Sequence, residues 1–345
     1  MKSKNTIEAV AKLAKVSPAT VSRVINRTSR VSAPVESRIR AAAEKLGVNL
    51  KRKNKTKLIA FLLSNRSLLY PFHSQVFLAV QGCCAVNGYS LLFFPLQYSQ
   101  QQSSEKLDLP PILQRSDVID GLIVSGVNHQ NLLDALGRTG LPFAILGDTV
   151  HGPWRESEYD VVRIDDTDGA YQTTRYLLSL GHTRIAYVAN ARLVWFERRA
   201  AGYKRAMDEA DLPSWISTID SENEHEVGFL GTKAILAQGR NEIDAIFAGS
   251  DAIAYGVYSA LREAGIAVPR GVSVCGFNDT PDASLLHPPL TSVCVFPDLI
   301  GRTLSELLLE RIADPSVPAR SRILHTQLIK RESCLPSLRT EMVSR

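Results

Sequence analysis

The sequence lacks the features that mark membrane, secreted and metal-binding proteins. No apolar run in its 345 residues approaches the roughly 18 residues of a membrane-spanning helix. The N-terminus is basic, but no apolar segment with a cleavage site follows it, so we expect no secretory signal. The five cysteines are scattered, without a CxxC pair or a Cys/His spacing typical of metal sites. We therefore expect free thiols, a cytoplasmic location, no metal and no membrane partner.

Common catalytic motifs are missing as well. The chain contains no GxxxxGKS/T, GxSxG or HExxH segment, and its seven histidines are isolated from one another. Adjacent acids such as Asp165 and Asp166 point their side chains apart rather than toward one substrate. We therefore expect that the protein is not an enzyme and that it uses no cofactor.

Basic side chains are concentrated at one end of the chain. Residues 1–57 carry fifteen Lys and Arg but three acids, a net charge of +12, whereas the remaining 288 residues carry a net charge of −7. A basic head on a mildly acidic body indicates that the head alone meets a polyanion. The composition, 45% apolar and 22% charged, is typical of a folded globular chain. The length allows two or three domains of ~100–150 residues each.

The basic head is predicted to contain three short helices. Thr6 can cap a helix over residues 6–14, and after a tight turn Ser17 and Pro18 begin a second helix. A third helix begins at Ser32 and closes the core. This arrangement is typical of a helix-turn-helix domain, whose second helix enters the major groove of DNA. A three-helix bundle with a merely solvated polar face remains the alternative, although such a bundle seldom carries so much positive charge.

The second helix also carries a specific signature. The sequence VSPATVSRVIN at residues 16–26, followed by Val31 and Ser32, resembles the DNA-binding head of the LacI/GalR repressor family at every fixed position of that family's motif. The resemblance implies that Pro18, Ala19 and Arg23 face base edges. It also implies that several hydroxyl and amide side chains face phosphates, namely Thr6, Ser17, Thr20, Ser22, Asn26 and Ser32. Arg23 is best suited to a bidentate contact with guanine.

The junction that follows departs from the family's pattern. In the family a hinge helix forms here on DNA and inserts a leucine into the minor groove, but residues 48–57 are short and lack that helix's Ala-Arg-x-Leu core. Five cations within seven residues favour a solvated linker over residues 49–57 that binds phosphate through charge, in particular through Lys51, Arg52 and Lys53. The alternatives are a plain solvated linker without a role in DNA binding and, least favoured, a hinge helix that inserts into the minor groove.

The body alternates apolar strand-like runs with amphipathic segments of helix length. Strands are predicted at 58–63, 90–94, 121–124, 142–146, 161–164, 184–188, 243–247 and 272–277. Helices are predicted at 73–86, 105–115, 131–138, 168–180, 198–210, 226–238 and 252–264. Repeated strand–helix units predict parallel sheets covered on both faces, and two series of units predict two lobes. Segments such as DGLIV at 120–124 and GHTRI at 181–185 extend the resemblance to the LacI/GalR family along the body.

The resemblance implies that residues 58–340 form a two-lobed effector-binding and dimerisation domain like the type I periplasmic binding proteins. We expect the chain to cross between the lobes near residues 160, 290 and 318. Lobe 1 would then contain residues 58–160 and 291–318, and lobe 2 residues 161–290 and 319–340. Ligands of such sheets bind beyond the carboxyl ends of the strands, in the cleft between the lobes.

Five residues are candidates for contacting a ligand in that cleft, namely Phe72, Asp148, Arg199, Asp251 and Asn278. By the resemblance Arg199 grips ligand oxygens, with a surface arginine as the alternative. Asn278 stands where the family usually has Asp, which favours an uncharged ligand over a cationic one. Phe72 either stacks on the ligand or belongs to the core, and Asp251 either binds ligand hydroxyls or caps its helix. Asp148 lies one position beyond a common ligand acid of the family, and Asp165 and Trp195 are further candidates without an assigned role.

Together these features predict a multidomain protein, with an all-α helix-turn-helix head over residues 1–48 and an α/β two-lobed effector domain. The predicted function is that of a homodimeric transcriptional regulator, a repressor, that binds operator DNA. A sugar or related metabolite bound between the lobes would control the affinity for DNA allosterically. One alternative is a cytoplasmic sugar-binding protein with an incidental head. Another is an effector-independent DNA-binding protein, which would leave the cleft unexplained.

Overall fold

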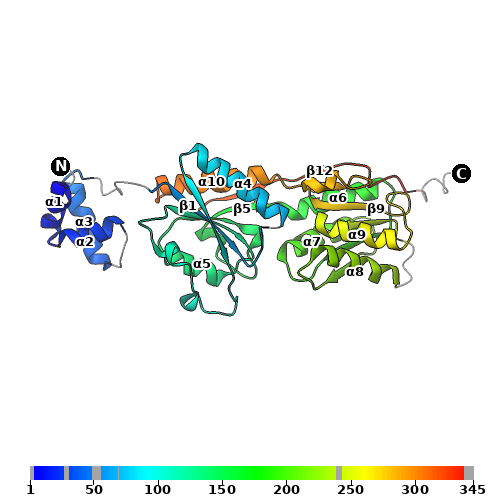
Figure 1. Cartoon of the computed structure of the whole chain (residues 1–345), viewed down its shortest axis with the longest axis horizontal. Helices are drawn as coiled ribbons and strands as arrows, with labels where there is room; N and C mark the ends of the chain where they lie inside the picture. The colour runs from blue at the N-terminus through cyan, green and yellow to red at the C-terminus, as the bar shows by residue number, and fades with distance from the viewer. Residues whose placement is uncertain (1–3, 27–30, 49–55, 69, 238–242, 338–345) are drawn as a thin grey trace.

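The computed structural model describes residues 4–26, 31–48, 56–68, 70–237 and 243–337. Figure 1 shows a small helical head at the N-terminal end and two α/β lobes that follow it. The head contains α1 (Lys4–Ala14), α2 (Pro18–Asn26) and α3 (Ala33–Lys45). These correspond to the three helices predicted from the sequence, except that α1 begins at Lys4, so Thr6 lies within the helix and is not its cap. Their apolar faces form one small core that includes Val10, Val21 and Ile39.

A tight turn joins α1 to α2. Lys15 has a φ of 55°, and the amide of Val16 donates to the carbonyl oxygen of Ala11 at 3.0 Å. Such a left-handed residue with a hydrogen bond back to the last turn ends an α-helix abruptly. The Ser17 hydroxyl then accepts a hydrogen bond from the amide of Thr20 at 3.1 Å, which caps α2 as expected.

The first lobe is built on a six-stranded sheet in which all neighbouring strands are parallel. Its strands are β1 (Leu58–Ser64), β2 (Ser90–Leu96), β3 (Gly121–Gly126), β4 (Phe143–Leu146), β5 (Asp160–Ile164) and β11 (Ser321–Leu324), in the order β11-β5-β4-β3-β1-β2. The helices of this lobe are α4 (Pro71–Val86), α5 (Gln130–Gly137) and α10 (Pro297–Ala313). In Figure 1, α4 and α10 lie together on one face of the sheet and α5 on the other.

The second lobe repeats this topology. Its strands are β6 (Ile185–Asn190), β7 (Trp215–Ile219), β8 (Ala245–Ala248), β9 (Ser273–Asn278), β10 (Thr291–Cys294) and β12 (Gln327–Ile329), in the order β12-β10-β9-β8-β6-β7. Its helices are α6 (Asp166–Ser179), α7 (Val194–Asp208), α8 (Glu224–Ala237) and α9 (Asp251–Glu263). The strand β12 runs antiparallel to β10, and the other neighbours are parallel. The repeated strand–helix pattern therefore predicted the architecture of both lobes correctly.

The three crossings between the lobes lie later in the chain than expected. The strands β5 and β11 pair with each other in the first lobe, and β10 pairs with β9 in the second. The predicted boundaries at 160, 290 and 318 placed each of these strands in the opposite lobe and are wrong. Each of these strands pairs with its neighbour before the chain crosses, so the crossings follow Ile164, Cys294 and Leu324.

The helix predicted at 105–115 is also wrong. Two short 3-10 helices stand there instead, Ser104–Lys106 and Pro111–Gln114. Pro110 and Pro111 interrupt the segment, because a proline ring has no amide hydrogen to donate and restricts the residue before it to extended conformations. The amphipathic spacing of the segment therefore does not produce an α-helix.

Candidate ligand-binding and DNA-binding sites

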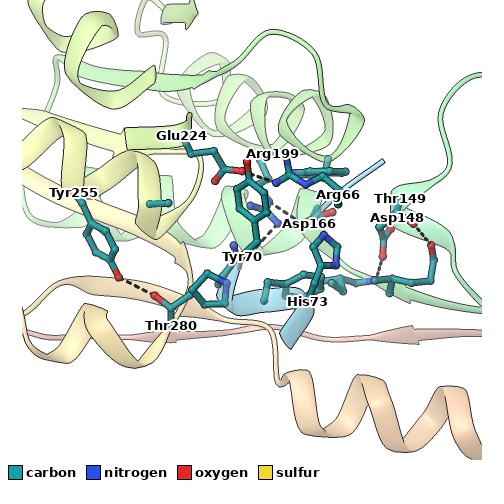
Figure 2. Close-up of a pocket in the computed structure, with 17 residues that line it drawn as sticks. Arg66, Tyr70, His73, Asp148, Thr149, Asp166, Arg199, Glu224, Tyr255 and Thr280 are labelled. Atoms are coloured by element: carbon teal, nitrogen blue, oxygen red, sulfur yellow. Dashed lines mark hydrogen bonds and ion pairs between the residues drawn. The ribbon is translucent and has the colours of Figure 1, made fainter. Parts of the chain in front are cut away.

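A pocket of about 690 Å³, open to solvent, lies between the two lobes. Its walls come from the carboxyl ends of strands and the starts of helices in both lobes, as the close-up in Figure 2 shows. The described lining residues are Arg66, Tyr70, Pro71, Phe72, His73, Leu146, Asp148, Thr149, Ile164, Asp166, Trp195, Arg199, Glu224, Ala252, Tyr255, Asn278 and Thr280. Four of the five predicted ligand residues are among them, and Asp251 is the exception.

Arg199 joins three segments of the second lobe at the pocket wall. Its Nε donates to Asp166 Oδ1 at 2.8 Å, its Nη1 to the carbonyl oxygen of Gly249 at 2.6 Å and its Nη2 to Asn278 Oδ1 at 3.3 Å. The guanidinium also stacks on the ring of Phe277, 3.7 Å from its centroid. Because the residue is 3% exposed, the alternative of a surface arginine is wrong.

Close packing of two helices brings Arg199 and its partner together. Asp166 is the first residue of α6, and Arg199 lies on α7. Gly202, one turn after Arg199, permits the contact, since a Cβ there would lie 2.1 Å from the carbonyl oxygen of Thr167. The helices could not approach so closely with a larger residue at this position.

Asp166 is a pocket residue that sequence reasoning missed. It is 1% exposed, and its second oxygen, Oδ2, is buried without a hydrogen-bond partner among the described residues. The signal for it was its place two residues after the strand end at Ile164, as the first residue of α6. Asp165, the neighbour named as a candidate, instead caps α6 by accepting a hydrogen bond from the amide of Asp168 at 3.1 Å.

An ion pair connects the lobes across the pocket. Arg66, from the loop after β1, donates to Glu224 Oε1 at 2.8 Å at the start of α8, and both side chains are about one-tenth exposed. Tyr70 stacks on the guanidinium at 3.8 Å and donates from its hydroxyl to the carbonyl oxygen of Glu222. Glu224 also accepts a hydrogen bond from the Ser250 hydroxyl at 2.7 Å.

Asp148 lies at a second contact between the lobes. Its carboxylate accepts a hydrogen bond from the amide of Ile164, and its carbonyl oxygen accepts one from Arg198 of α7 at 2.9 Å. Burial, reinforced by the negative charge of Asp166, raises the pKa of Asp148 to about 7, although the Ile164 amide and Arg198 oppose the shift. This carboxyl group therefore changes its charge near neutral pH.

Aromatic side chains form much of the remaining wall. Phe72 lines the pocket and also packs against the core of the body, so both of its expected environments are present. The neighbouring His73, which sequence reasoning missed, is buried with its Nδ1 3.3 Å from the Ser125 hydroxyl. Burial and the charge of Arg66 lower the pKa of His73 to about 3, so its ring is neutral. Trp195 lies opposite, with its ring centroid 5.5 Å from the Arg66 guanidinium.

Asp251 does not cap its helix, and it is absent from the pocket lining that the structure describes. The Ser250 hydroxyl caps α9, and Asp251 is the first helical residue and fully buried. Its carboxylate accepts hydrogen bonds from the amide of Thr280 at 2.6 Å and from the Ser292 hydroxyl at 2.5 Å. It therefore fixes the loop after β9, whose Thr280 does line the pocket. Burial raises the pKa of Asp251 to about 7.

The candidate DNA-binding residues of the head lie on and beside α2. Ser17, Pro18, Ala19 and Arg23 are exposed, and Thr20 and Ser22 are half-buried. Ser32 is exposed just before α3 and makes no capping bond with its side chain. The side chains of Thr6 and Asn26, and all of Lys51, Arg52 and Lys53, lie outside the described residues.

The end of the junction is attached to the first lobe. Asp120 Oδ2 accepts hydrogen bonds from the amide of Lys57 at 2.7 Å and from the Thr56 hydroxyl at 3.2 Å. The ammonium of Lys57 lies 4.2 Å from the centroid of the Tyr89 ring. Lys57 therefore packs on the lobe, although its charge was counted with the linker.

Helices long and apolar enough to cross a membrane are absent from the part of the chain that the structure describes. Within the same residues no group of three or more His, Cys, Asp or Glu side chains could hold a metal ion.

A helix-turn-helix head followed by two lobes that enclose a pocket defines a ligand-responsive DNA-binding regulator. Residues 6–48 match the model of the bacterial regulatory proteins of the lacI family, and residues 174–334 match the periplasmic binding protein-like domain. The chain belongs to the LacI family of bacterial regulatory proteins. Members of this family are transcriptional regulators, and the fold class predicted from the sequence is confirmed.

Full-length relatives agree with this assignment. The HTH-type transcriptional repressor PurR of Haemophilus influenzae (strain PittEE) is 31% identical over 343 residues, which cover 95% of this chain and 98% of the relative. The transcriptional regulator CelR in complex with cellobiose is 29% identical with a TM-score of 0.71, covering 95% of this chain and 99% of that one. The lac repressor dimer bound to operator and the anti-inducer ONPF is 25% identical with a TM-score of 0.68, covering 94% and 98%. The chain is thus a ligand-controlled DNA-binding repressor, as predicted.

Proposed function

We propose that the chain represses transcription as a homodimer, in which each head reads one half of a near-palindromic operator and a sugar-like molecule in the pocket sets the affinity. One observation supports this most directly: residues of both lobes line a single pocket in a chain that also carries a helix-turn-helix head. In this proposal residues 1–48 bind DNA, residues 49–57 connect, and residues 58–340 bind the effector and dimerise. Two-fold symmetry of the protein would then match that of the operator.

In the head, α2 is the element that reads DNA. Arg23 is exposed on it and can form a bidentate contact with guanine, whereas Pro18 and Ala19 can offer only apolar contacts, for example to a thymine methyl group. The phosphate contacts come from Thr6, Ser17, Thr20, Ser22, Asn26 and Ser32. Lys51, Arg52 and Lys53 add attraction that does not depend on sequence.

In the pocket, polar and aromatic groups contact different parts of the ligand. Phe72 and Trp195 offer rings to the apolar faces of a ligand, and Asp148, Arg199 and Asn278 offer polar groups to its hydroxyls. Asp251 acts indirectly by holding Thr280. The contacts Arg66–Glu224 and Arg198–Asp148 join the lobes and so depend on how the lobes are arranged. A ligand that binds one arrangement of the lobes more tightly shifts the protein toward it and thereby changes the relative placement of the two heads.

The pocket in this proposal binds its ligand without chemical turnover, and the protein acts in the cytoplasm, where it meets DNA. The sequence motifs of common enzymes are absent, and the family consists of transcriptional regulators.

The experiment begins with selection of bound sequences from random duplex DNA by the full-length chain. Mobility shift with the selected operator is then repeated with a panel of sugars, sugar derivatives and nucleobases. We expect a two-fold symmetric site and at least one metabolite that changes the affinity. Absence of sequence preference would contradict the repressor function, and catalytic turnover of a bound sugar would establish an enzyme instead.

A further inference from the structure

Both arginines that line the pocket are paired with carboxylates of the same lining. Among the described lining residues the basic side chains other than His73 are Arg66 and Arg199. Arg66 pairs with Glu224 at 2.8 Å, and Arg199 pairs with Asp166 at 2.8 Å. Asp148 adds a third carboxyl group to the same lining. A negatively charged ligand would therefore meet three carboxyl groups and no arginine that lacks a carboxylate partner.

Two polar atoms of these pairs still lack a hydrogen-bond partner within the described chain. Asp166 Oδ2 is a buried acceptor, and Arg66 Nε is a buried donor. Buried polar groups in proteins are nearly always hydrogen-bonded, so both atoms point to a ligand that completes them. A hydroxyl or amide group can donate and accept, whereas a phosphate dianion only accepts and an ammonium only donates.

We propose, building on the function proposed above, that the pocket selects an uncharged ligand and excludes the phosphate ester of the same molecule. The ligand donates a hydrogen bond to Asp166 Oδ2 and accepts one from Arg66 Nε. Its ring lies among the aromatic side chains, which include Phe72 and Trp195. The pocket prefers the uncharged molecule to its phosphate ester because each lining arginine is already neutralised by a carboxylate before the ligand binds.

The test compares three uncharged sugars with their phosphate esters on the full-length chain. The pairs are D-ribose with ribose 5-phosphate, D-glucose with glucose 6-phosphate, and cellobiose with cellobiose 6-phosphate. Calorimetry and thermal shift should show that the uncharged member of at least one pair binds, and binds at least roughly tenfold more tightly than its ester. Tighter binding of any ester than of its sugar would overturn the inference, as would the failure of all three sugars to bind.

A substitution that frees one arginine tests the charge argument through a gain of binding. Glu224→Gln keeps the shape of the side chain but removes the charge that neutralises Arg66, and the Ser250 hydroxyl can donate to or accept from the new amide. We expect affinity for the ester of the preferred pair to rise by roughly tenfold. A folded variant, with the circular dichroism spectrum of the unaltered chain, that shows no such gain would contradict the inference.

A second substitution tests the acceptor. In Asp166→Asn the remaining oxygen keeps the hydrogen bond from Arg199, and an amide nitrogen, which donates, replaces the acceptor Oδ2. We therefore expect the affinity for the uncharged sugar to fall by at least roughly tenfold. Asp168→Asn is the matched control, because it makes the same chemical change on the same helix at an exposed position. Equal affinities of the two variants would contradict the role of Asp166.

The outcome is separable from that of the repressor function. Operator binding in the mobility shift reports on the repressor, whereas the preference between sugar and ester reports on the charge of the pocket. A chain that binds its operator and responds to an ester would support the first proposal and overturn this one.

Discussion

Arg66 and Glu224, which are 158 residues apart in the sequence, form a buried ion pair that joins the two lobes beside the pocket. A pair in this position resists opening of the cleft even before a ligand binds. Charged partners this far from solvent depend on each other, because either alone would remain buried without compensation.

Removing one partner of this pair should therefore be costly. We expect Arg66→Met to lower the free energy of unfolding by about 3 kcal/mol, since it leaves Glu224 buried and unpaired. The control is Arg205→Met, which breaks a pair with Glu209 whose side chains are 59% and 41% exposed. That change should cost less than about 1 kcal/mol. Urea denaturation measures the free energy of unfolding of both variants. Equal losses would show that the inter-lobe pair stabilises the protein no more than an exposed pair does.

Sequence recognition by α2 should depend on Arg23. We expect Arg23→Ala to weaken operator binding by about 1–3 kcal/mol and to weaken binding to random DNA much less. Arg38→Ala changes another exposed arginine, on α3, and should affect both kinds of DNA to a similar extent. Fluorescence anisotropy on the two duplexes at one salt concentration measures the difference. Equal losses on both duplexes for Arg23→Ala would rule out a base contact.

The contribution of the basic junction to DNA binding should be measurable in the salt dependence of the affinity. Lys51, Arg52 and Lys53 lie outside the described residues, and their role rests on their charge. If each contacts one phosphate, replacing all three with Gln should reduce the slope of log K against log salt by about 0.9 per contact. A matched triple change of Lys204, Arg205 and Lys233, exposed cations of the second lobe, should leave the slope unaltered. An unchanged slope after the junction substitution favours the plain solvated linker.

The stability of the protein should fall as the pH rises through the titration of Asp251. Its pKa is raised from an ordinary 3.8 to about 7 by burial, so between about pH 4 and 7 the folded state holds a proton that the unfolded chain has released. This group therefore contributes a loss of up to about 1.4 kcal/mol per pH unit in that window. We expect Asp251→Asn to show a smaller decrease with pH in urea titrations. Asp282→Asn, an exposed change on the adjoining loop, should follow the unaltered chain.

Local sequence patterns predicted much of the fold. Apolar spacing identified all three helices of the head, and alternating strands and helices identified most of both lobes. Of the predicted capping residues, Ser17 caps α2, whereas α1 begins at Lys4, before Thr6. The 105–115 helix failed because Pro110 and Pro111 outweigh a favourable spacing. The exposed strand β11 and the short β12 have no strong apolar pattern, so these two strands could not be recognised from local signals.

The pocket was predictable where a residue follows a strand end directly. Asn278, at the end of β9, was located in this way together with the family resemblance, whereas Phe72, at the start of α4, was located through the resemblance alone. By contrast, Arg66 and Glu224 meet only because the two lobes face each other, and the sequence around either residue does not show its partner. The buried partners of Asp251 were missed for a similar reason, since Thr280 reaches it from the loop after β9 and Ser292 from β10. Interactions set by tertiary packing leave little trace in a short sequence window.

The last strands of the two sheets have a consequence for synthesis of the chain. Both β11 and β12 lie at sheet edges but come from residues 321–329, after every other strand of their lobes has been made. The helical head can fold while these residues are still inside the ribosome. Neither lobe can close its sheet until then, so a chain terminated early would carry a finished head on two unfinished lobes. Pairing at these edges thus links complete translation to the ability to sense a ligand.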